Sequence, residues 1–311
     1  MVQKRKIVFF IPDKVHVLDL SGPVQVFYEA NCYGAAYELS YCSLEKQITS
    51  SAGLSFGAAQ SYADMHLRAG DFIFLPGADM EYLRSHLFKS QKKFFEWLIK
   101  NHRIGVNICT ICTGAFILAQ AGLLNSKTCT THWKRIEELK KTYPALQIKK
   151  DVLYVHEDNI YTSAGITSGI DLSLAIVEEH YGPLFANKIS RELLVYYRRG
   201  PDHTQQSVYL SYRNHIHTGI HHVQDWLIEN LEKKSTIAKL SSIANMGERN
   251  LTRVFKKATG LTINQYTKAL RLEKLKTLLS STDLKSDALA KKIGYRNTRQ
   301  LRRIKNSSII L

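Results

Sequence analysis

The hydrophobic pattern of this 311-residue chain changes once, near residue 200, and this change limits the folds that the chain can adopt. Before it, short apolar runs rich in β-branched and aromatic residues alternate with amphipathic stretches. After it, the apolar residues recur only at helical spacing. Strands that alternate with helices predict a parallel sheet covered by helices on both faces. We therefore expect an α/β domain followed by an all-α domain, a division that the chain length also favours.

The same pattern predicts the individual elements and the domain boundaries. A polar, Gly- and Pro-containing stretch over residues 201–220 predicts a linker between a first domain, 1–200, and a second, 221–311. The strands are expected at residues 6–11, 37–42, 71–76, 105–108, 153–156 and 160–163. The helices are expected at residues 20–30, 91–102, 114–121, 131–143, 167–181, 184–198, 223–231, 236–244, 248–258, 264–279 and 287–293, with another starting near 298.

The charge of the chain is concentrated in its last third. The formal net charge is +16, of which +12 belongs to residues 201–311 and only +4 to residues 1–200. Charge gathered in one domain indicates a polyanionic partner. Five cysteines are too few and too irregularly spaced for a disulfide framework, and no apolar run is long enough to span a membrane. We expect a soluble, cytoplasmic protein that does not bind membranes.

Cys112 follows an apolar strand and precedes a helix, with small residues at the corner between them. A strand, a tight corner and a helix form the geometry of a nucleophile elbow, in which the side chain at the turn is held in a strained conformation. A thiol at the amino end of a helix also lies near the positive end of the helix dipole, which predicts a lowered thiol pKa. Cys112 is therefore a candidate nucleophile.

Motifs in the first two hundred residues resemble the ThiJ/PfpI-type domain, which has a flavodoxin-like fold related to class I glutamine amidotransferases. The motifs are Asp19-Leu20-Ser21-Gly22-Pro23, Leu75-Pro76-Gly77, Cys112-Thr113-Gly114-Ala115, Ala121-Gly122-Leu123-Leu124, Thr130-Thr131-His132-Trp133 and the stretch from Thr162 to Leu172. The resemblance implies that the elbow cysteine is paired with an acid from the first strand–helix loop, which is Asp19 here. Isonitrile hydratases resemble this chain in having Asp, Cys and Thr at the positions of Asp19, Cys112 and Thr113. Peptidase-like members have His where this chain has Thr113, which disfavours a protease.

The residue types suggest roles for this group. Asp19 can exchange a proton, Cys112 can attack an electrophilic carbon, and the backbone amides of Thr113 and Gly77 can stabilise developing negative charge. His132 is either a base or a packing residue. We expect no cofactor and no metal. Cys109 and Cys112 have no second cysteine pair, and the histidines at 215, 217, 221 and 222 have neither Cys nor carboxylate at ligand spacing.

A helix, a three-residue turn and a second helix follow one another over residues 236–258. Leu251 and Phe255 belong to the apolar stripe of the second helix, so its basic and amide side chains are predicted to face away from the core. This is typical of a recognition helix, which reads base edges near its start and contacts phosphates further along. The candidate DNA-binding residues of this helix are Arg249, Asn250, Arg253, Lys256 and Lys257.

A weaker copy of this unit lies about fifty residues later, where Leu289, Ile293 and Leu301 repeat the apolar spacing. Residues 221–304 resemble the AraC family of transcription regulators, which implies two helix-turn-helix units on one face of double-stranded DNA. The family continues with an aromatic residue where this chain has Lys305, so we expect the second unit to be incomplete. Its candidate DNA-binding residues are Arg296, Asn297, Arg299, Arg302 and Arg303.

Together the two domains resemble the GlxA-type regulators. The resemblance implies a sequence-specific DNA-binding transcriptional regulator, expected to be a homodimer, whose first domain senses an unidentified small molecule without catalysis or supports dimerisation. The alternative is an active cysteine-dependent hydratase or hydrolase with a DNA-binding tail. A third possibility is a redox sensor that uses Cys112.

Overall fold

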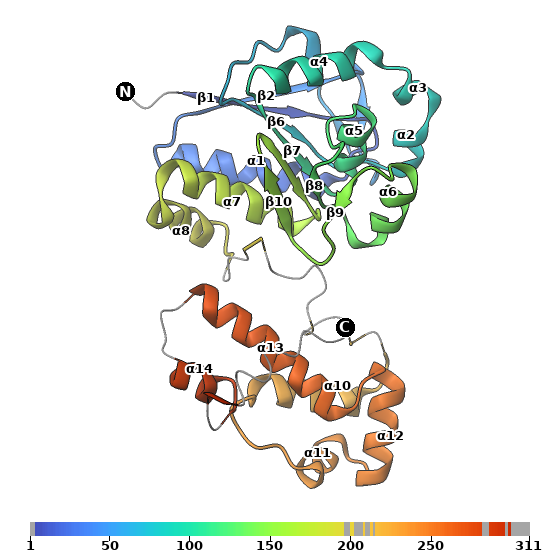
Figure 1. Cartoon of the computed structure of the whole chain (residues 1–311), viewed down its shortest axis with the longest axis vertical. Helices are drawn as coiled ribbons and strands as arrows, with labels where there is room; N and C mark the ends of the chain where they lie inside the picture. The colour runs from blue at the N-terminus through green and yellow to red at the C-terminus, as the bar shows by residue number, and fades with distance from the viewer. Residues whose placement is uncertain are drawn as a thin grey trace. The chain divides into compact units, whose positions relative to one another are not determined.

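The computed structural model describes residues 4–195, 200, 201, 208, 212, 213, 215–281, 286–295, 298 and 299. The chain divides into two compact units, Met1–Gln205 and Gln206–Leu311 (Figure 1). In the described part of the chain, no helix is long and apolar enough to cross a membrane.

The main sheet of the first unit consists of parallel strands with one exception at its edge. Its strand order is β10-β11-β7-β6-β1-β2-β5, and only β10 runs antiparallel to its neighbour. Residues 158–159 join β10 to β11, and so short a connection can only reverse the chain direction. The strands are β1 (Arg5–Phe10), β2 (Tyr37–Ser43), β5 (Gln60–Ser61), β6 (Phe72–Leu75), β7 (Asn107–Ile111), β10 (Tyr154–Glu157) and β11 (Ile160–Ser163).

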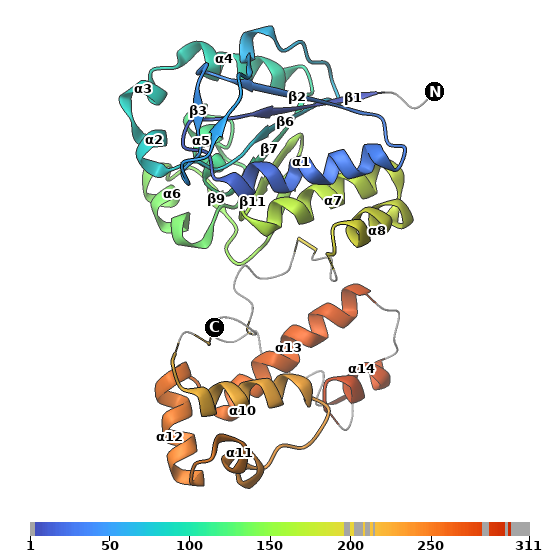
Figure 2. The same ribbon diagram turned by 180° about the vertical axis from the view of Figure 1, so that it is seen from behind.

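Alternation along β1 builds a hydrophobic core on each face of this sheet. Ile7 and Phe9 belong to one core, whereas Val8 and Phe10 belong to the other, because successive side chains of a strand point to opposite faces. Helices α1, α7 and α8 cover one face, and α4 lies on the opposite face (Figures 1 and 2). The predicted α/β layers are therefore confirmed.

The predicted helices of this unit are present to within about five residues at each end, with one exception, and two short helices, Met80–Arg84 and His86–Lys89, were not predicted. The predicted helix 184–198 ends at residue 192, since Leu194 has a φ of +54°. The predicted strand 105–108 begins only at residue 107, because Gly105 has a φ of +88°, and it continues to residue 111. The helices are α1 (Val17–Cys32), α2 (Met80–Arg84), α3 (His86–Lys89), α4 (Lys92–Arg103), α5 (Ala115–Gln120), α6 (Ile136–Thr142), α7 (Thr167–Tyr181) and α8 (Pro183–Glu192).

Two short strand pairs and three 3-10 turns complete the described part of the first unit. The pairs are β3 (Ile48–Thr49) with β4 (Ser55–Phe56), and β8 (Thr128–Cys129) with β9 (Gln147–Ile148). The 3-10 turns are η1 (Tyr62–Asp64), η2 (Cys112–Gly114) and η3 (Trp133–Arg135).

The described part of the second unit is helical, as predicted. Ile220, Leu240, Leu251, Phe255 and Tyr266 are buried in its core. Its helices are α10 (Thr218–Glu229), α11 (Ile237–Ala244), α12 (Glu248–Thr259), α13 (Ile263–Ser281) and α14 (Ser286–Lys292).

Helix α10 begins inside the stretch that was expected to be a linker. Gly219 lies so close to α11 that an added Cβ would be 2.7 Å from the Ala244 carbonyl oxygen. Glycine thus permits the two helices to approach, and the next residue, Ile220, is fully buried in the core of this unit. Within the expected linker, residues 202–207, 209–211 and 214 lie outside the described residues.

Candidate functional site

Cys112 occupies the sharp corner between β7 and α5. Its φ is +56°, a left-handed conformation that costs a non-glycine residue free energy and is typical of a nucleophile elbow. The Thr131 hydroxyl donates a hydrogen bond of 2.8 Å to the Cys112 carbonyl oxygen. An added Cβ at Gly114 would lie 2.1 Å from the Leu75 carbonyl oxygen, so the corner also needs glycine at that position.

Asp19, from the first turn of α1, lies beside this cysteine. The carboxylate is fully buried, and its Oδ1 accepts a 2.6 Å hydrogen bond from the Ile166 backbone N–H. Its Oδ2 lies 3.2 Å from Nδ1 of His16. One oxygen of the carboxylate lies within 4.8 Å of the Cys112 sulfur. The structure therefore brings together the acid and the thiol that the sequence pointed to.

The expected lowering of the Cys112 pKa is wrong. Burial raises the pKa of this thiol, the nearby Asp19 carboxylate raises it further, and a hydrogen bond from the Thr113 backbone N–H opposes the increase only in part. The side chain is 5% exposed, so a thiolate would lose most of its hydration. The dipole of the short helix α5, only six residues long, is outweighed by this desolvation.

Two glycines pack against the thiol and the carboxylate. An added Cβ at Gly165 would lie 2.2 Å from Cys112 Cβ, and one at Gly77 would lie 2.5 Å from Asp19 Oδ2. The Gly77 carbonyl accepts a 2.8 Å hydrogen bond from the His16 backbone N–H. Gly77 thus belongs to the site as a close-packed backbone segment.

Thr113 lies next to Cys112, but its hydroxyl is committed to the backbone of Ala78. It accepts a hydrogen bond of 2.9 Å from the Ala78 N–H and donates one of 2.8 Å to the Ala78 carbonyl. Its side chain therefore ties the elbow to the segment after β6.

His16 belongs to the site, and the sequence interpretation did not include it. It precedes α1 directly, which places it within hydrogen-bond reach of Asp19 three residues later. Its Nε2 lies 3.5 Å from Asp79 Oδ1. The hydrogen bond to Asp19 raises the pKa of His16, burial opposes this, and Asp79 adds to the increase. The His-x-x-Asp spacing at a helix start was the signal that could have identified this residue.

His132 lies near the site and is about half-buried. Burial lowers its pKa, whereas the Asp19 carboxylate acts in the opposite direction. Its ring is 5.7 Å from that of Trp133, which is 43% exposed. These contacts fit the packing role, and a neutral imidazole would also be available as a base.

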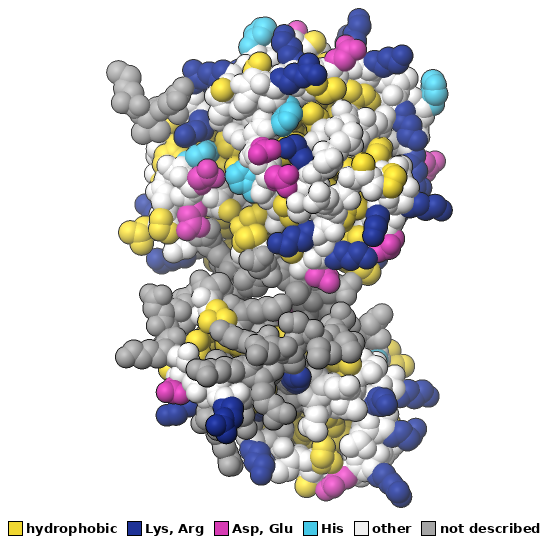
Figure 3. All heavy atoms as spheres, viewed as in Figure 1, with side chains coloured by type: hydrophobic (Ala, Val, Ile, Leu, Met, Phe, Trp, Pro, Cys, Tyr) yellow, Lys and Arg dark blue, Asp and Glu magenta, His cyan; other side chains and the backbone are white. Residues whose placement is uncertain are grey.

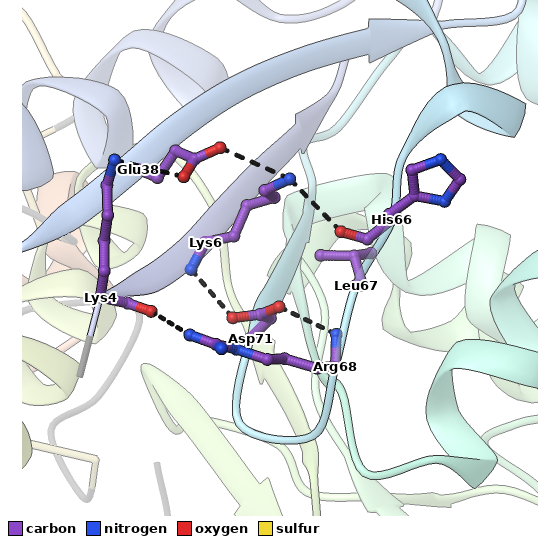
Figure 4. Close-up of a pocket in the computed structure, with 7 residues that line it drawn as sticks. All are labelled: Lys4, Lys6, Glu38, His66, Leu67, Arg68 and Asp71. Carbon is purple, nitrogen blue, oxygen red and sulfur yellow. Dashed lines mark hydrogen bonds and ion pairs between the residues drawn. The ribbon is translucent and has the colours of Figure 1, made fainter.

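A separate hollow lies at the opposite ends of the strands, where β1 and β6 begin (Figure 4). Its volume is about 410 Å³. The Lys6 ammonium contacts Glu38 and the His66 carbonyl, and the Asp71 carboxylate accepts two backbone N–H groups. The hollow is lined by Lys4, Lys6, Glu38, His66, Leu67, Arg68 and Asp71. Both lysines of the hollow are thus paired with Glu38, and the Arg68 guanidinium donates a hydrogen bond to the Lys4 carbonyl.

In the second unit, α11 and α12 form a helix-turn-helix. The turn contains Asn245, which ends α11 in the left-handed conformation with a φ of +50°. Leu251 and Phe255 of α12 are fully buried. Lys and Arg side chains project from the part of the unit that carries α12 (Figure 3). The exposed side chains of this helix include all five predicted DNA-binding residues, Arg249, Asn250, Arg253, Lys256 and Lys257.

The five exposed DNA-binding candidates of α12 remain available to a ligand. Arg253 donates a 2.8 Å hydrogen bond to the Asn250 side-chain oxygen, which orients both side chains. Among the described residues, neither arginine and neither lysine of this group forms an ion pair with a carboxylate. Their positive charge is therefore not neutralised from within the described part of the chain.

The second predicted unit begins with α14, which ends at Lys292 and is followed by a turn in which Gly294 has a φ of +78°. Leu289 and Ile293 are buried, as its apolar spacing predicted. Arg299 is exposed. The other candidate residues of this unit, Arg296, Asn297, Arg302 and Arg303, lie outside the described residues, as do Leu301 and Lys305.

Comparisons with known proteins agree with this geometry. Residues 5–179 match the DJ-1/PfpI family, and residues 240–305 match a helix-turn-helix domain. A crystal structure of an AraC family transcriptional regulator from Pseudomonas putida has the same fold over 61% of this chain and 99% of that one, with a TM-score of 0.53 and 20% identity.

Three curated relatives match more than half of this chain. The HTH-type transcriptional regulator CdhR of Pseudomonas aeruginosa is 30% identical over 70% of this chain and 63% of its own length. The corresponding regulator GlxA of Rhizobium meliloti is 24% identical over 80% of this chain and 74% of its own. The isonitrile hydratase of Pseudomonas putida is 29% identical over 60% of this chain and 76% of its own length. The chain thus spans less than two thirds of the length of CdhR. Because the DJ-1/PfpI match covers more than half of its residues, the chain belongs to the DJ-1/PfpI family. It combines that domain with a helix-turn-helix domain.

Proposed function

We propose that this protein is a cytoplasmic, sequence-specific transcriptional regulator that binds double-stranded DNA through α12. Residues 1–200 form a domain that binds a small effector or mediates homodimerisation, and residues 221–311 form the DNA-binding domain. The observation that carries the proposal is the helix-turn-helix of α11 and α12, whose exposed face carries four cations without carboxylate partners among the described residues. Two of the relatives are described as HTH-type transcriptional regulators.

The face of α12 has the two kinds of side chain that DNA recognition requires. Arg249 and Asn250 lie at the start of the helix, from which side chains reach base edges in the major groove. Lys256 and Lys257 lie in its last turn, where they suit contacts to phosphates, which give affinity but no sequence information. Arg299 of the second unit adds another exposed cation.

The properties of Asp19 and Cys112 in the first domain support sensing better than catalysis. Cys112 is buried, and the raised pKa of its thiol leaves little thiolate at neutral pH. A ligand that enters beside Asp19 and Cys112 regulates DNA binding only if it binds one conformation of the protein more tightly than another. The effector changes the DNA affinity of the helix-turn-helix domain by stabilising the conformation that it binds more tightly.

Fluorescence anisotropy with the full chain tests DNA recognition. The protein is expected to bind duplex DNA from upstream of its own operon more tightly than random duplex of equal length. Arg249→Ala should reduce that preference, by about 1–3 kcal/mol if the side chain contacts a base, whereas Lys257→Ala should weaken both complexes equally. The exposed Lys93→Ala on α4 is the control and should change neither. Equal affinity of the wild-type protein for the two duplexes would contradict the proposal.

The second candidate is a cysteine-dependent hydratase or hydrolase with a DNA-binding tail. It is supported by the strained Cys112 beside a buried carboxylate and by similarity to an isonitrile hydratase. Incubation of the full chain with isonitriles decides between the two. Turnover that disappears in Cys112→Ser and persists in Cys32→Ser supports the enzyme, and no turnover by the wild-type protein eliminates it. DNA affinity that responds to peroxide only while Cys112 is present would indicate redox sensing instead.

A further inference from the structure

We propose that His16, Asp19 and Cys112 form a binding site for a divalent transition-metal ion of the zinc type. Each residue offers one ligand atom, and the three atoms all lie within 4.8 Å of one another. Asp19 and Cys112 are buried, and about a third of the His16 side chain is exposed. The site is therefore enclosed on one side and reachable on the other. The sequence predicted no metal, and that prediction did not consider His16 together with Asp19 and Cys112.

The donor atoms favour zinc over the alkaline-earth ions. Thiolate sulfur, imidazole nitrogen and carboxylate oxygen are the three ligand types that Zn²⁺ accepts, whereas Mg²⁺ and Ca²⁺ prefer oxygen donors throughout. Three protein ligands leave one position of a tetrahedral ion free for water or a small ligand, as in catalytic zinc sites. When the metal binds, the Cys112 thiol releases its proton to solvent and the sulfur forms the bond to the ion.

The residues around the cluster hold these donors in place. The Ile166 N–H binds Asp19 Oδ1, which leaves Oδ2 directed at His16. Nε2 of His16 lies 3.5 Å from Asp79 Oδ1, so His16 can coordinate through Nδ1 while Asp79 orients the ring from outside. A carboxylate behind a coordinating histidine is the usual outer-shell arrangement at zinc sites, and it raises the basicity of the ligand.

Co²⁺, which substitutes for Zn²⁺ and absorbs light, is the probe for this site. The full-length protein is first stripped with a chelator and kept in a thiol-free reductant. One equivalent of Co²⁺ per chain should then produce a sulfur-to-cobalt charge-transfer band and the d–d bands of a tetrahedral site, and Zn²⁺ should abolish both. The charge-transfer band should disappear in Cys112→Ser and remain in Cys32→Ser, which removes an exposed cysteine.

Asp79→Asn tests the ligand geometry without altering the buried residues. This half-exposed side chain acts only behind His16, so its loss should weaken Co²⁺ and Zn²⁺ about 10–100-fold while the protein stays folded. The exposed Asp64→Asn should leave metal affinity unchanged. A wild-type protein without the charge-transfer band, a band that persists in Cys112→Ser, or equal affinity in Asp79→Asn and the wild type would overturn the proposed site. Because these measurements contain no DNA, their failure leaves the regulator proposal untouched.

Discussion

At the scale of single residues, burial decides the chemistry of this protein more than helix position does. Cys112 lies at the start of a helix, yet burial and the Asp19 carboxylate raise the pKa of its thiol. The same burial depends on Gly165 and Gly77, whose missing side chains let the backbone pack onto the thiol and the carboxylate. Close packing at this corner therefore keeps Cys112 in its neutral form.

Gly165→Ala tests this close packing. The φ of Gly165 is +95°, and an added Cβ would lie 2.2 Å from Cys112 Cβ. Strain and steric overlap together are expected to lower the free energy of unfolding by about 2–5 kcal/mol, measured by urea denaturation. Gly53→Ala is the matched control, because Gly53 also has a positive φ but no atom within 4 Å of its added Cβ. It should cost only about 1–2 kcal/mol. Equal losses in the two variants would show that Gly165 packs less tightly than described.

At the scale of elements, polar side chains link the helices to the sheet. His180 of α7 lies with Nδ1 2.8 Å from the Tyr37 hydroxyl of β2, and its ring packs edge-on against Phe72 of β6. Burial lowers the pKa of His180 to about 4. The helix therefore packs onto the sheet through a histidine that stays neutral.

This histidine predicts a loss of stability in acid. The unfolded chain binds a proton at His180 below pH 6.5, whereas the folded chain does not until the pH falls to about 4. The free energy of unfolding should thus decrease as the pH falls through this range, by roughly 1–3 kcal/mol, since the ring is partly exposed. His180→Gln should remove this contribution, as measured by urea denaturation at several pH values. The exposed His86→Gln on α3 should retain the pH dependence of the wild type, and an unchanged dependence in His180→Gln would refute the assignment.

At the scale of the whole molecule, the charge follows the division into two units. Residues 201–311 hold +12 of the net charge of +16. On α12 this charge has no carboxylate partners among the described residues, whereas Lys4 and Lys6 of the first unit are paired with Glu38. The second unit is consequently the part of the chain that we expect to bind a polyanion.

The salt dependence of DNA binding should reflect this distribution. Each phosphate contact adds about 0.9 to the slope of log affinity against log salt concentration. Replacing both Lys256 and Lys257 by Ala should therefore reduce the slope by about 2, as measured by anisotropy at several salt concentrations. Replacing Lys92 and Lys93 of α4 by Ala removes the same charge from the first unit and should leave the slope unchanged. A similar reduction in both double variants would mean that binding follows net charge and not the face of α12.

The sequence by itself determined the layers of the first unit, the helices of the second, and the residues of the elbow and of α12. These features depend on local periodicity, on turn-forming glycines and on contiguous motifs, all of which can be recognised along the chain. Only the tertiary structure decided that Asp79 and Cys112 join His16 and Asp19, and that the pKa of Cys112 is raised. These features depend on segments up to about a hundred residues apart that pack together and exclude water. Excluding water raises the free energy of a charged thiolate, and this cost cannot be read from the sequence because it depends on which distant residues surround the group.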